Sequence, residues 1–178
     1  MKSFCMWMSC VIACSFFGCE EKTLPSVIST IDSRTLPQQE SWNSTIVVSD
    51  SGRINAVIDA GYIRVSELSQ QTQMSKGVIV HFYNHEGKQT SLLTSEEGSV
   101  DEISNNLEAR KNVVVVSSDS SRMTTEQLFW DNQRQLIHTP EYVQITTAKE
   151  KLRGHGFESD QSLKHYRVFR VTGQTQAD

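Results

Sequence analysis

The sequence has no cysteine where a folded domain could use one. Its four cysteines are Cys5, Cys10, Cys14 and Cys19, and everything after residue 19 is cysteine-free. Such a body cannot hold a zinc–thiolate site, a thiol nucleophile or an internal disulfide. Nine glycines and three prolines in 178 residues are too few for a collagenous or low-complexity chain. The net charge of -4 gives no basic surplus, so nucleic-acid binding is not expected.

Recognisable catalytic motifs are also missing. The chain contains no Gly-X-Ser-X-Gly elbow, so nucleophilic hydrolysis has no candidate. His81 and His85 are four residues apart, but the local pattern is a strand running into a turn, so metal binding is not expected. The Gly154-His155-Gly156 segment lacks the third glycine of a dinucleotide loop, and it predicts a bend or bulge between strands.

The acidic and aromatic side chains have structural explanations. Glu96 and Glu97, followed by Asp101 and Glu102, predict a solvated hairpin tip rather than a pair of catalytic carboxylates. Trp130 is predicted to pack in the core as an anchor rather than to bind a ligand. The sequence therefore predicts no enzyme, no catalytic residue, no metal site and no cofactor.

The first nineteen residues, MKSFCMWMSCVIACSFFGC, have the pattern of a targeting segment. Lys2 precedes an apolar run of about 15 residues, short for a bilayer span of roughly 20. The junction Phe17-Gly18-Cys19 resembles a bacterial lipoprotein box, which predicts a signal peptide over 1–18 and a lipid anchor on Cys19. Cleavage before Cys14 and a marginal transmembrane anchor remain alternatives. Each of them places the body outside the cytoplasm and tethers it to a membrane.

Three further segments are predicted after the signal peptide. Residues 19–43 contain two of the three prolines and little apolar periodicity, which indicates a lipid-anchored flexible tether. Residues 44–173 form the predicted domain, and 174–178 form a short tail. The acidic body offers no polybasic patch for anionic lipids, so acyl chains must anchor it, at about 0.8 kcal/mol per buried CH₂.

Short runs rich in β-branched and aromatic residues alternate with Gly, Asn and Asp groups from residue 45 onward. The predicted strands are Thr45–Val48, Ile54–Ala60, Val78–Tyr83, Thr90–Thr94, Leu107–Arg110, Val113–Ser117, Met123–Trp130, Gln135–His138, Tyr142–Ile145, Lys151–Gly154 and Tyr166–Val171. A short helix is predicted only over Ile63–Ser69. The fold class is all-β: a sandwich, a barrel or a jelly roll.

Side-chain parity along these strands places apolar residues on one face. The residues that show it most clearly are Met74, Val78, Val80, Phe82, Leu107, Ala109, Val113 and Val115. The opposite positions carry His81, Tyr83, Glu108 and Arg110, which is typical of a sheet with one wet face. The apolar face is either the core of a sandwich or the wall of a groove for acyl chains, and the pattern alone does not separate the two.

Four stretches together resemble a known family. They are SDSGRINAVIDA (49–60), GVIVHFYNHEGKQTSLLTSEEGSV (77–100), NLEARKNVVVVSSDSSRMTTEQLFWDNQRQLIHTPEYVQI (106–145) and LRGHGFESDQSLKHYRVFRVTG (152–173). In this order they are similar to the periplasmic lipopolysaccharide-export protein LptC family, in the lipoprotein form found in Bacteroidetes-like bacteria. The most specific segments are LEARKNVVVV, MTTEQLFWD and GHGFESD. The resemblance implies a half-open β-jelly roll of the OstA/LptA-like type.

The resemblance also implies a function as a bridge. The domain would take lipopolysaccharide from the inner-membrane ABC transporter, hold its acyl chains along the eight-residue apolar face, and pass it to a downstream LptA-like periplasmic bridge protein. The first strand, Thr45–Val48, would meet the transporter. The downstream partner would bind the last strand through Tyr166, Val168, Phe169 and Val171. The implied location is the periplasmic side of the Gram-negative envelope, with the anchor in the inner membrane.

One departure from the family matters. Many members carry a transmembrane helix that packs into the transporter, whereas this chain has a predicted lipidated cysteine at Cys19. Regulation of the transporter through such a helix is therefore not expected. The alternative function is a lipid-anchored structural or assembly lipoprotein with a closed β-sandwich core, and an open groove would distinguish the bridge from it.

Overall fold

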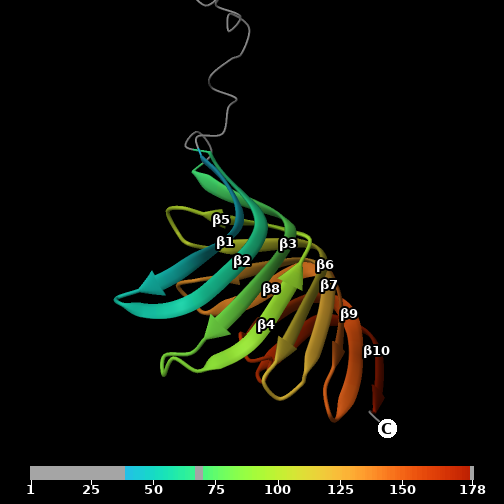
Figure 1. Ribbon diagram of the computed structural model, residues 1–178. Helices are drawn as coiled ribbons and strands as arrows, with labels where there is room; N and C mark the ends of the chain where they lie inside the picture. The colour runs from blue at the N-terminus through green and yellow to red at the C-terminus, as the bar shows by residue number, and fades with distance from the viewer. Residues whose placement is uncertain (1–38, 67–69, 177–178) are drawn as a thin grey trace, which may run out of the picture. The chain divides into compact units, whose positions relative to one another are not determined.

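The computed structural model describes residues 39–66 and 70–176, in which every regular element is a β-strand. The strands are β1 (Gln39–Asp50), β2 (Arg53–Ser66), β3 (Gln71–Tyr83), β4 (Gln89–Ser95), β5 (Glu97–Asp101), β6 (Leu107–Ser117), β7 (Arg122–Asp131), β8 (Leu136–Thr146), β9 (Glu150–Asp160) and β10 (Tyr166–Gln176). They form one sheet in the order β1-β2-β3-β4-β6-β7-β8-β9-β10, and β5 pairs with β3 and β6 (Figure 1). Because β1 and β10 are its two ends, the sheet is not a closed barrel. The predicted all-β class is confirmed.

Most strands bend near the middle, and the bends lie side by side. Gly61 in β2 has no room for a side chain, because a Cβ there would lie 2.5 Å from the carbonyl oxygen of Lys76 in β3. The N–H of Gly77 donates to the carbonyl of Glu96 at 3.2 Å, and the N–H of Glu96 donates to the carbonyl of Lys111 at 3.1 Å. A line of bends therefore crosses the sheet from β2 to β6.

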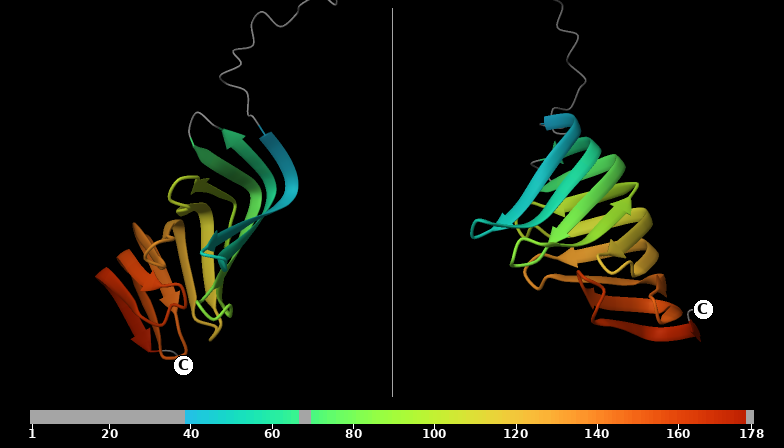
Figure 2. Two further views of the ribbon diagram at one scale, coloured as in Figure 1. Left: turned by 90° about the vertical axis from the view of Figure 1, so that its left-hand side faces the viewer. Right: turned by 60° about the horizontal axis from the view of Figure 1, so that its bottom comes forward.

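The bends keep both halves of each strand facing one interior. In β3, Thr72 and Met74 before the bend and Val78, Val80 and Phe82 after it are all buried. The two residues at the bend take positive φ values, 61° at Lys76 and 89° at Gly77, so the chain changes direction without turning its apolar face outward. Figure 2 shows the strands bent in this way, with the sheet curving over its inner face.

A single buried apolar cluster fills this interior. Its largest fully buried side chains include Trp130, Phe82 and Phe157, which come from three different strands. Ile46 and Val65 near the first edge, and Tyr166 and Val168 at the last edge, are partly buried and pack against the cluster. The apolar interior therefore reaches both open edges of the sheet.

The structure corrects two local predictions. The helix predicted over Ile63–Ser69 is wrong for Ile63–Ser66, which end β2 and pair with Gln71–Met74 of β3; 67–69 lie outside the described residues. A single helical turn has few hydrogen bonds to offset its nucleation cost, and a neighbouring strand competes with it successfully. The second correction concerns the first strand: β1 begins at Gln39, so residues 39–43 of the predicted tether are strand.

The predicted hairpin tip at Glu96 and Glu97 is also wrong. β4 and β5 run one after the other in the same gap between β3 and β6, and Glu96 lies at the bend between them. Glu97 faces Lys111, whose ammonium donates to its carboxylate at 2.7 Å. This hydrogen bond lowers the pKa of Glu97. Glu96 accepts a hydrogen bond from the side chain of Asn112, so both carboxylates contact the bend of β6 instead of capping a hairpin.

Candidate functional site

The eight residues predicted to line a groove come together on two strands. Met74, Val78, Val80 and Phe82 lie on β3, and Leu107, Ala109, Val113 and Val115 lie on β6. All eight belong to the one apolar cluster, and each is at most 3% exposed. The inward parity expected from the sequence therefore holds on both sides of the bends. Contact with lipid stays a prediction, because complete burial is common to a closed groove and a packed core.

Trp130 on β7 is the largest residue of this interior. Its ring lies 5.1 Å from that of Phe82, tilted by 59°, so it packs as the anchor that the sequence predicts. Its indole Nε1 is buried and has no hydrogen-bond partner, and the same holds for the hydroxyls of Ser91 and Ser159. No sequence pattern marks these two serines as buried, because a serine in a strand ordinarily faces water.

The last edge of the sheet is built on two glycines of β9. A Cβ at Gly154 would lie against the carbonyl oxygen of Arg170 and 2.5 Å from Cγ1 of Val168. Gly156 has a φ of 75°, and Phe169 covers it. The GHG segment therefore forms a bend, but it lies within β9 and not between two strands as predicted. Its glycines also let β10 approach β9 closely.

The four side chains predicted to bind a partner along β10 have different environments. Tyr166 and Val168 are half-buried against the core, whereas Phe169 and Val171 are 57% and 53% exposed. The Tyr166 hydroxyl donates to Glu150 at 2.7 Å. Burial, reinforced by that hydrogen bond, raises the pKa of Tyr166 to about 12. One half of the predicted edge thus holds β10 in place, and the other half remains exposed to solvent.

The first edge is longer than the predicted Thr45–Val48 strand. Trp42 and Val47 on β1 are more than half exposed, and the Trp42 ring lies 5.6 Å from that of Tyr62 on β2. Ile46 turns inward beside the core. Both edge strands therefore carry exposed apolar side chains next to unpaired backbone.

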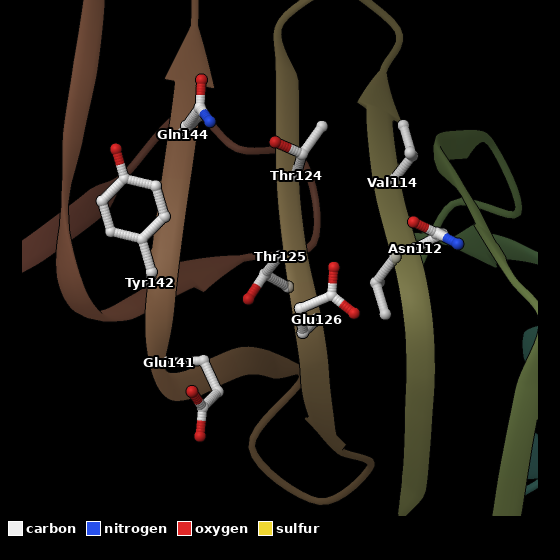
Figure 3. Close-up of a pocket in the computed structure, with 9 residues that line it drawn as sticks. Asn112, Val114, Thr124, Thr125, Glu126, Glu141, Tyr142 and Gln144 are labelled. Atoms are coloured by element: carbon white, nitrogen blue, oxygen red, sulfur yellow. The ribbon is translucent and has the colours of Figure 1, made fainter.

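A surface pocket lies where the β7–β8 ladder is interrupted (Figure 3). The pairing stops after Thr124 with Gln144 and resumes at Phe129 with His138. The pocket has a volume of about 330 Å³, and its lining includes Glu126 from β7, Glu141 and Tyr142 from β8, and Asn112 from β6. Pro140, which lacks an N–H, is the sequence signal for this gap.

The remaining candidates for chemistry do not assemble into a reactive group. His81 on β3 lies 3.8 Å from the carboxylate of Asp59, and His85 lies in the turn after β3. Asp101 caps a turn by accepting hydrogen bonds from Ser104, which lower the pKa of its carboxyl. No helix within the described ranges 39–66 and 70–176 is long and apolar enough to cross a bilayer.

Together these features define an all-β protein built on one bent, open-edged sheet around an apolar interior. A family model described as "Lipopolysaccharide-assembly, LptC-related" matches residues 29–176, and the chain belongs to this family. No curated protein matches the chain. Membership implies a non-catalytic role in lipopolysaccharide assembly and transport in the periplasmic cell envelope, and the open sheet is consistent with the family's jelly roll.

Proposed function

We propose that this chain is a bridge for lipopolysaccharide export. It accepts lipopolysaccharide from the inner-membrane ABC transporter and passes it along its inner face to the next periplasmic bridge protein. The observation that carries the proposal is the continuous apolar interior of a sheet that is open at both ends. Each acyl methylene left in water costs about 0.8 kcal/mol, so a carrier needs an apolar path without gaps.

In this proposal, acyl chains enter by parting the two bent sides of the sheet. Two buried polar groups without partners support a ligand in the interior, Trp130 Nε1 and Ser159 Oγ. They lie in one cross-strand row, on either side of Ile137. An unpaired buried polar group costs about 1–3 kcal/mol, and the ester and amide carbonyls of an acylated glycolipid can accept hydrogen bonds from both.

A second function remains a candidate because of one observation. The eight inner residues are almost completely buried, as they would be in a lipid-anchored structural or assembly lipoprotein with a closed β-sandwich core. The two functions differ in whether the interior ever holds lipid.

Crosslinking in cells tests the bridge against the scaffold. A photo-crosslinking phenylalanine analogue replaces Phe82, which is fully buried, and in a matched control it replaces the neighbouring Tyr83, which has the opposite parity. The bridge predicts a lipopolysaccharide adduct at position 82 and none at 83. Absence of an adduct at both positions, or equal adducts at both, would contradict the proposal.

The two ends of the sheet are assigned to two partners. We assign β1 to the periplasmic domains of the transporter, and Tyr166, Val168, Phe169 and Val171 on β10 to a downstream LptA-like bridge protein. Support comes from the unpaired edges, since a strand of a similar fold can extend the sheet there. Val168→Pro removes a backbone donor and fixes φ, so it should abolish capture of the downstream protein while β1–β8 stay folded.

The anchor belongs to the same proposal. A signal peptide over 1–18 is removed, Cys19 is acylated, and the segment from 19 to the start of β1 tethers the domain to the inner membrane. Cys19 and the signal segment lie outside the described residues. Cys19→Ser should prevent acylation, measured by incorporation of labelled fatty acid, whereas Cys14→Ser should leave it intact. The opposite result would move the anchor to Cys14.

A further inference from the structure

The bends divide the sheet into two sides that face each other across the interior. One ladder row crosses the first side from Thr72 in β3 to Tyr166 in β10. Another row crosses the second side from Val80 in β3 to Leu152 in β9. The turns between strands therefore lie along two rims. The β9–β10 turn, residues 161–165, is on the first rim, and the β6–β7 turn, residues 118–121, is on the second.

The β9–β10 turn is buried although it lies at a rim. Leu163 is 2% exposed and belongs to the apolar cluster, and Gln161 is buried beside it in the chain. The β5–β6 turn lies on the same rim, yet its hydrophobic residue, Ile103, is 72% exposed. Turn residues ordinarily face water. The β9–β10 turn therefore folds inward over the interior, whereas the β5–β6 turn stands out from it.

The inward position of Leu163 requires a strained backbone. Its φ of 57° lies in the left-handed region, which a leucine rarely adopts. The N–H of Leu163 donates to the carbonyl of Asp160 at 3.2 Å. The Asp160 carboxylate accepts hydrogen bonds from the Ser162 hydroxyl at 2.8 Å and from the Lys164 N–H at 3.1 Å. Strain of this kind persists only while such contacts hold, so the turn can relax once Leu163 leaves the interior.

Two interactions reach from this turn to the opposite side. The hydroxyl of Tyr166, the residue after the turn, donates at 2.7 Å to Glu150, which begins β9 on the second side. The pKa of Asp119 in the β6–β7 turn is lowered first by the hydrogen bond from Ser117, and the charge of Lys164 lowers it further. Both interactions are polar and belong to no ladder. Water can replace them, so they can break while the strands stay paired.

The neighbouring turn on the first rim is held by similar contacts. Gln161 donates to the side-chain oxygen of Gln135 at 2.8 Å, and Gln135 donates to the carbonyl of Asn132 at 2.6 Å. Asn55 of β2, on the second side, donates to the side-chain oxygen of Asn132 at 3.0 Å. The β9–β10 turn is therefore the last member of a row of polar contacts between the rims.

We propose that residues 161–166 form a lid over the last strands of the sheet, with Leu163 as its plug. When the lid swings outward, Tyr166 releases Glu150, and acyl chains can pass out of the interior beside β10. When it closes, Leu163 fills the apolar space that they leave. The identity of the passing lipid rests on the proposed function, but the movement of the lid can be measured without lipid.

Two buried serines provide matched reporters of that movement. Ser159 is the last inward residue of β9 before the lid, and Ser91 lies on β4, away from it; both hydroxyls are buried without a partner. In the full-length chain, Ser159→Cys and Ser91→Cys are each exposed to a water-soluble thiol reagent. The same chain without a reporter gives the background of Cys5, Cys10, Cys14 and Cys19.

Lid variants should open the first reporter alone. Leu163→Ala removes the plug, and Lys164→Glu sets a negative charge against Asp119. Each should speed modification of the Ser159→Cys thiol roughly tenfold, because local opening becomes more frequent, and leave Ser91→Cys unchanged. If Leu163→Ala unfolds the domain, Lys164→Glu decides, because Lys164 is exposed. With Lys164→Glu, equal acceleration at both reporters, or none at Ser159→Cys, would overturn the proposal.

A lock tests whether the lid admits lipid. Asp119→Cys and Lys164→Cys are joined by a short bismaleimide in spheroplasts, with each single variant as control. A photo-crosslinker replaces Phe157, whose ring stacks on Tyr166, or Phe82 at the centre. The lock should remove the lipopolysaccharide adduct at 157 and keep the adduct at 82. An adduct at 157 that survives, or loss at both positions, would contradict the lid. No adduct at either position without the lock would contradict the bridge function instead, and the thiol rates would still decide on the lid.

Discussion

β3 and β10 are both rich in apolar and β-branched residues, yet they have opposite environments. β3 has neighbours on both sides, β2 on one and β4 and β5 on the other, and its inward residues are nearly free of solvent. β10 pairs only with β9, and of its inward residues Val168 is half-buried while Val171 is 53% exposed. Position in the sheet, rather than residue type, determines how much each valine contributes to stability.

This difference separates two tasks within one sheet. The centre provides the apolar interior, where Val80 is completely buried. The edge provides unpaired backbone and exposed apolar side chains, which suit association more than stability. Substitutions in β3 should therefore affect folding, and substitutions in β10 should mainly affect what binds.

The largest expected effect comes from the same substitution at the two positions. Val80→Glu places a carboxylate in a closed apolar interior, and the desolvation cost should destabilise the domain by several kcal/mol. Val171→Glu should change stability by less than about 0.5 kcal/mol, because the new charge can reach water. Urea unfolding of the full-length variants measures both values.

A small loss of stability in Val80→Glu would contradict the contrast between a closed centre at Val80 and an exposed edge at Val171. It would mean that water enters the interior beside Val80 even without lipid, so the centre would be a standing groove rather than a closed one. A large loss in Val171→Glu would instead show that β10 contributes to the core.

Much of this fold could be predicted from the sequence, because alternation is a local property. Val78, Val80 and Phe82 occupy every second position of their strand, with Ile79 and His81 between them, and the structure buries all three. The bends within the strands are harder to predict from the sequence than the alternation. Leu107–Arg110 and Val113–Ser117 were two predicted strands, and they are two halves of β6 joined at Lys111 and Asn112. Positive φ at a lysine is set by contacts across the sheet, so no local pattern reveals it.

The candidate site was predictable in part for the same reason. The inward faces of β3 and β6 follow from parity, but their distance in space depends on β4 and β5 filling the gap between them. The short helix predicted from Ile63 is wrong because residues 63–66 pair with β3, at positions five to eleven residues further along the chain. Whether the indole N–H of Trp130 finds a hydrogen-bond partner depends on all the strands that surround it. Its lack of a partner could therefore not be predicted from the sequence of β7 alone.

A smaller effect is expected where β10 rests on β9. Gly154→Ala would place a Cβ against the backbone of Arg170, and backbone cannot move aside as a flexible side chain can. We expect a loss of about 1–3 kcal/mol, typical of overpacking, with faster hydrogen exchange confined to β9 and β10. Gly173→Ala on β10 is the matched control, because nothing lies within 4 Å of its Cβ. Equal losses in both variants would mean that the close approach is not what Gly154 provides.

The smallest expected effect concerns Tyr166, which fastens the start of β10 to Glu150. Its pKa is raised to about 12 from an ordinary value of 10.0, chiefly by burial and then by the hydrogen bond to that carboxylate. A raised pKa means that the folded state favours the protonated phenol. The stabilisation is therefore fully present below pH 10 and is lost as the pH rises through about 12. Tyr166→Phe removes this dependence, because phenylalanine has no proton to lose.

Tyrosinate absorbance and hydrogen exchange together measure the effect. The pKa of Tyr62 is also raised, by its hydrogen bond to Glu40, so wild type should show more than one delayed ionisation. The step near pH 12 should be missing in Tyr166→Phe. Tyr142→Phe is the control, since Tyr142 is also on the C-terminal strands but is more exposed. Because β10 is an edge strand, the ionisation should loosen β10 before the rest of the sheet unfolds. If β3 amides exchange in the same step, the centre and the edge unfold as one unit, and the division between them drawn from Val80 and Val171 does not hold.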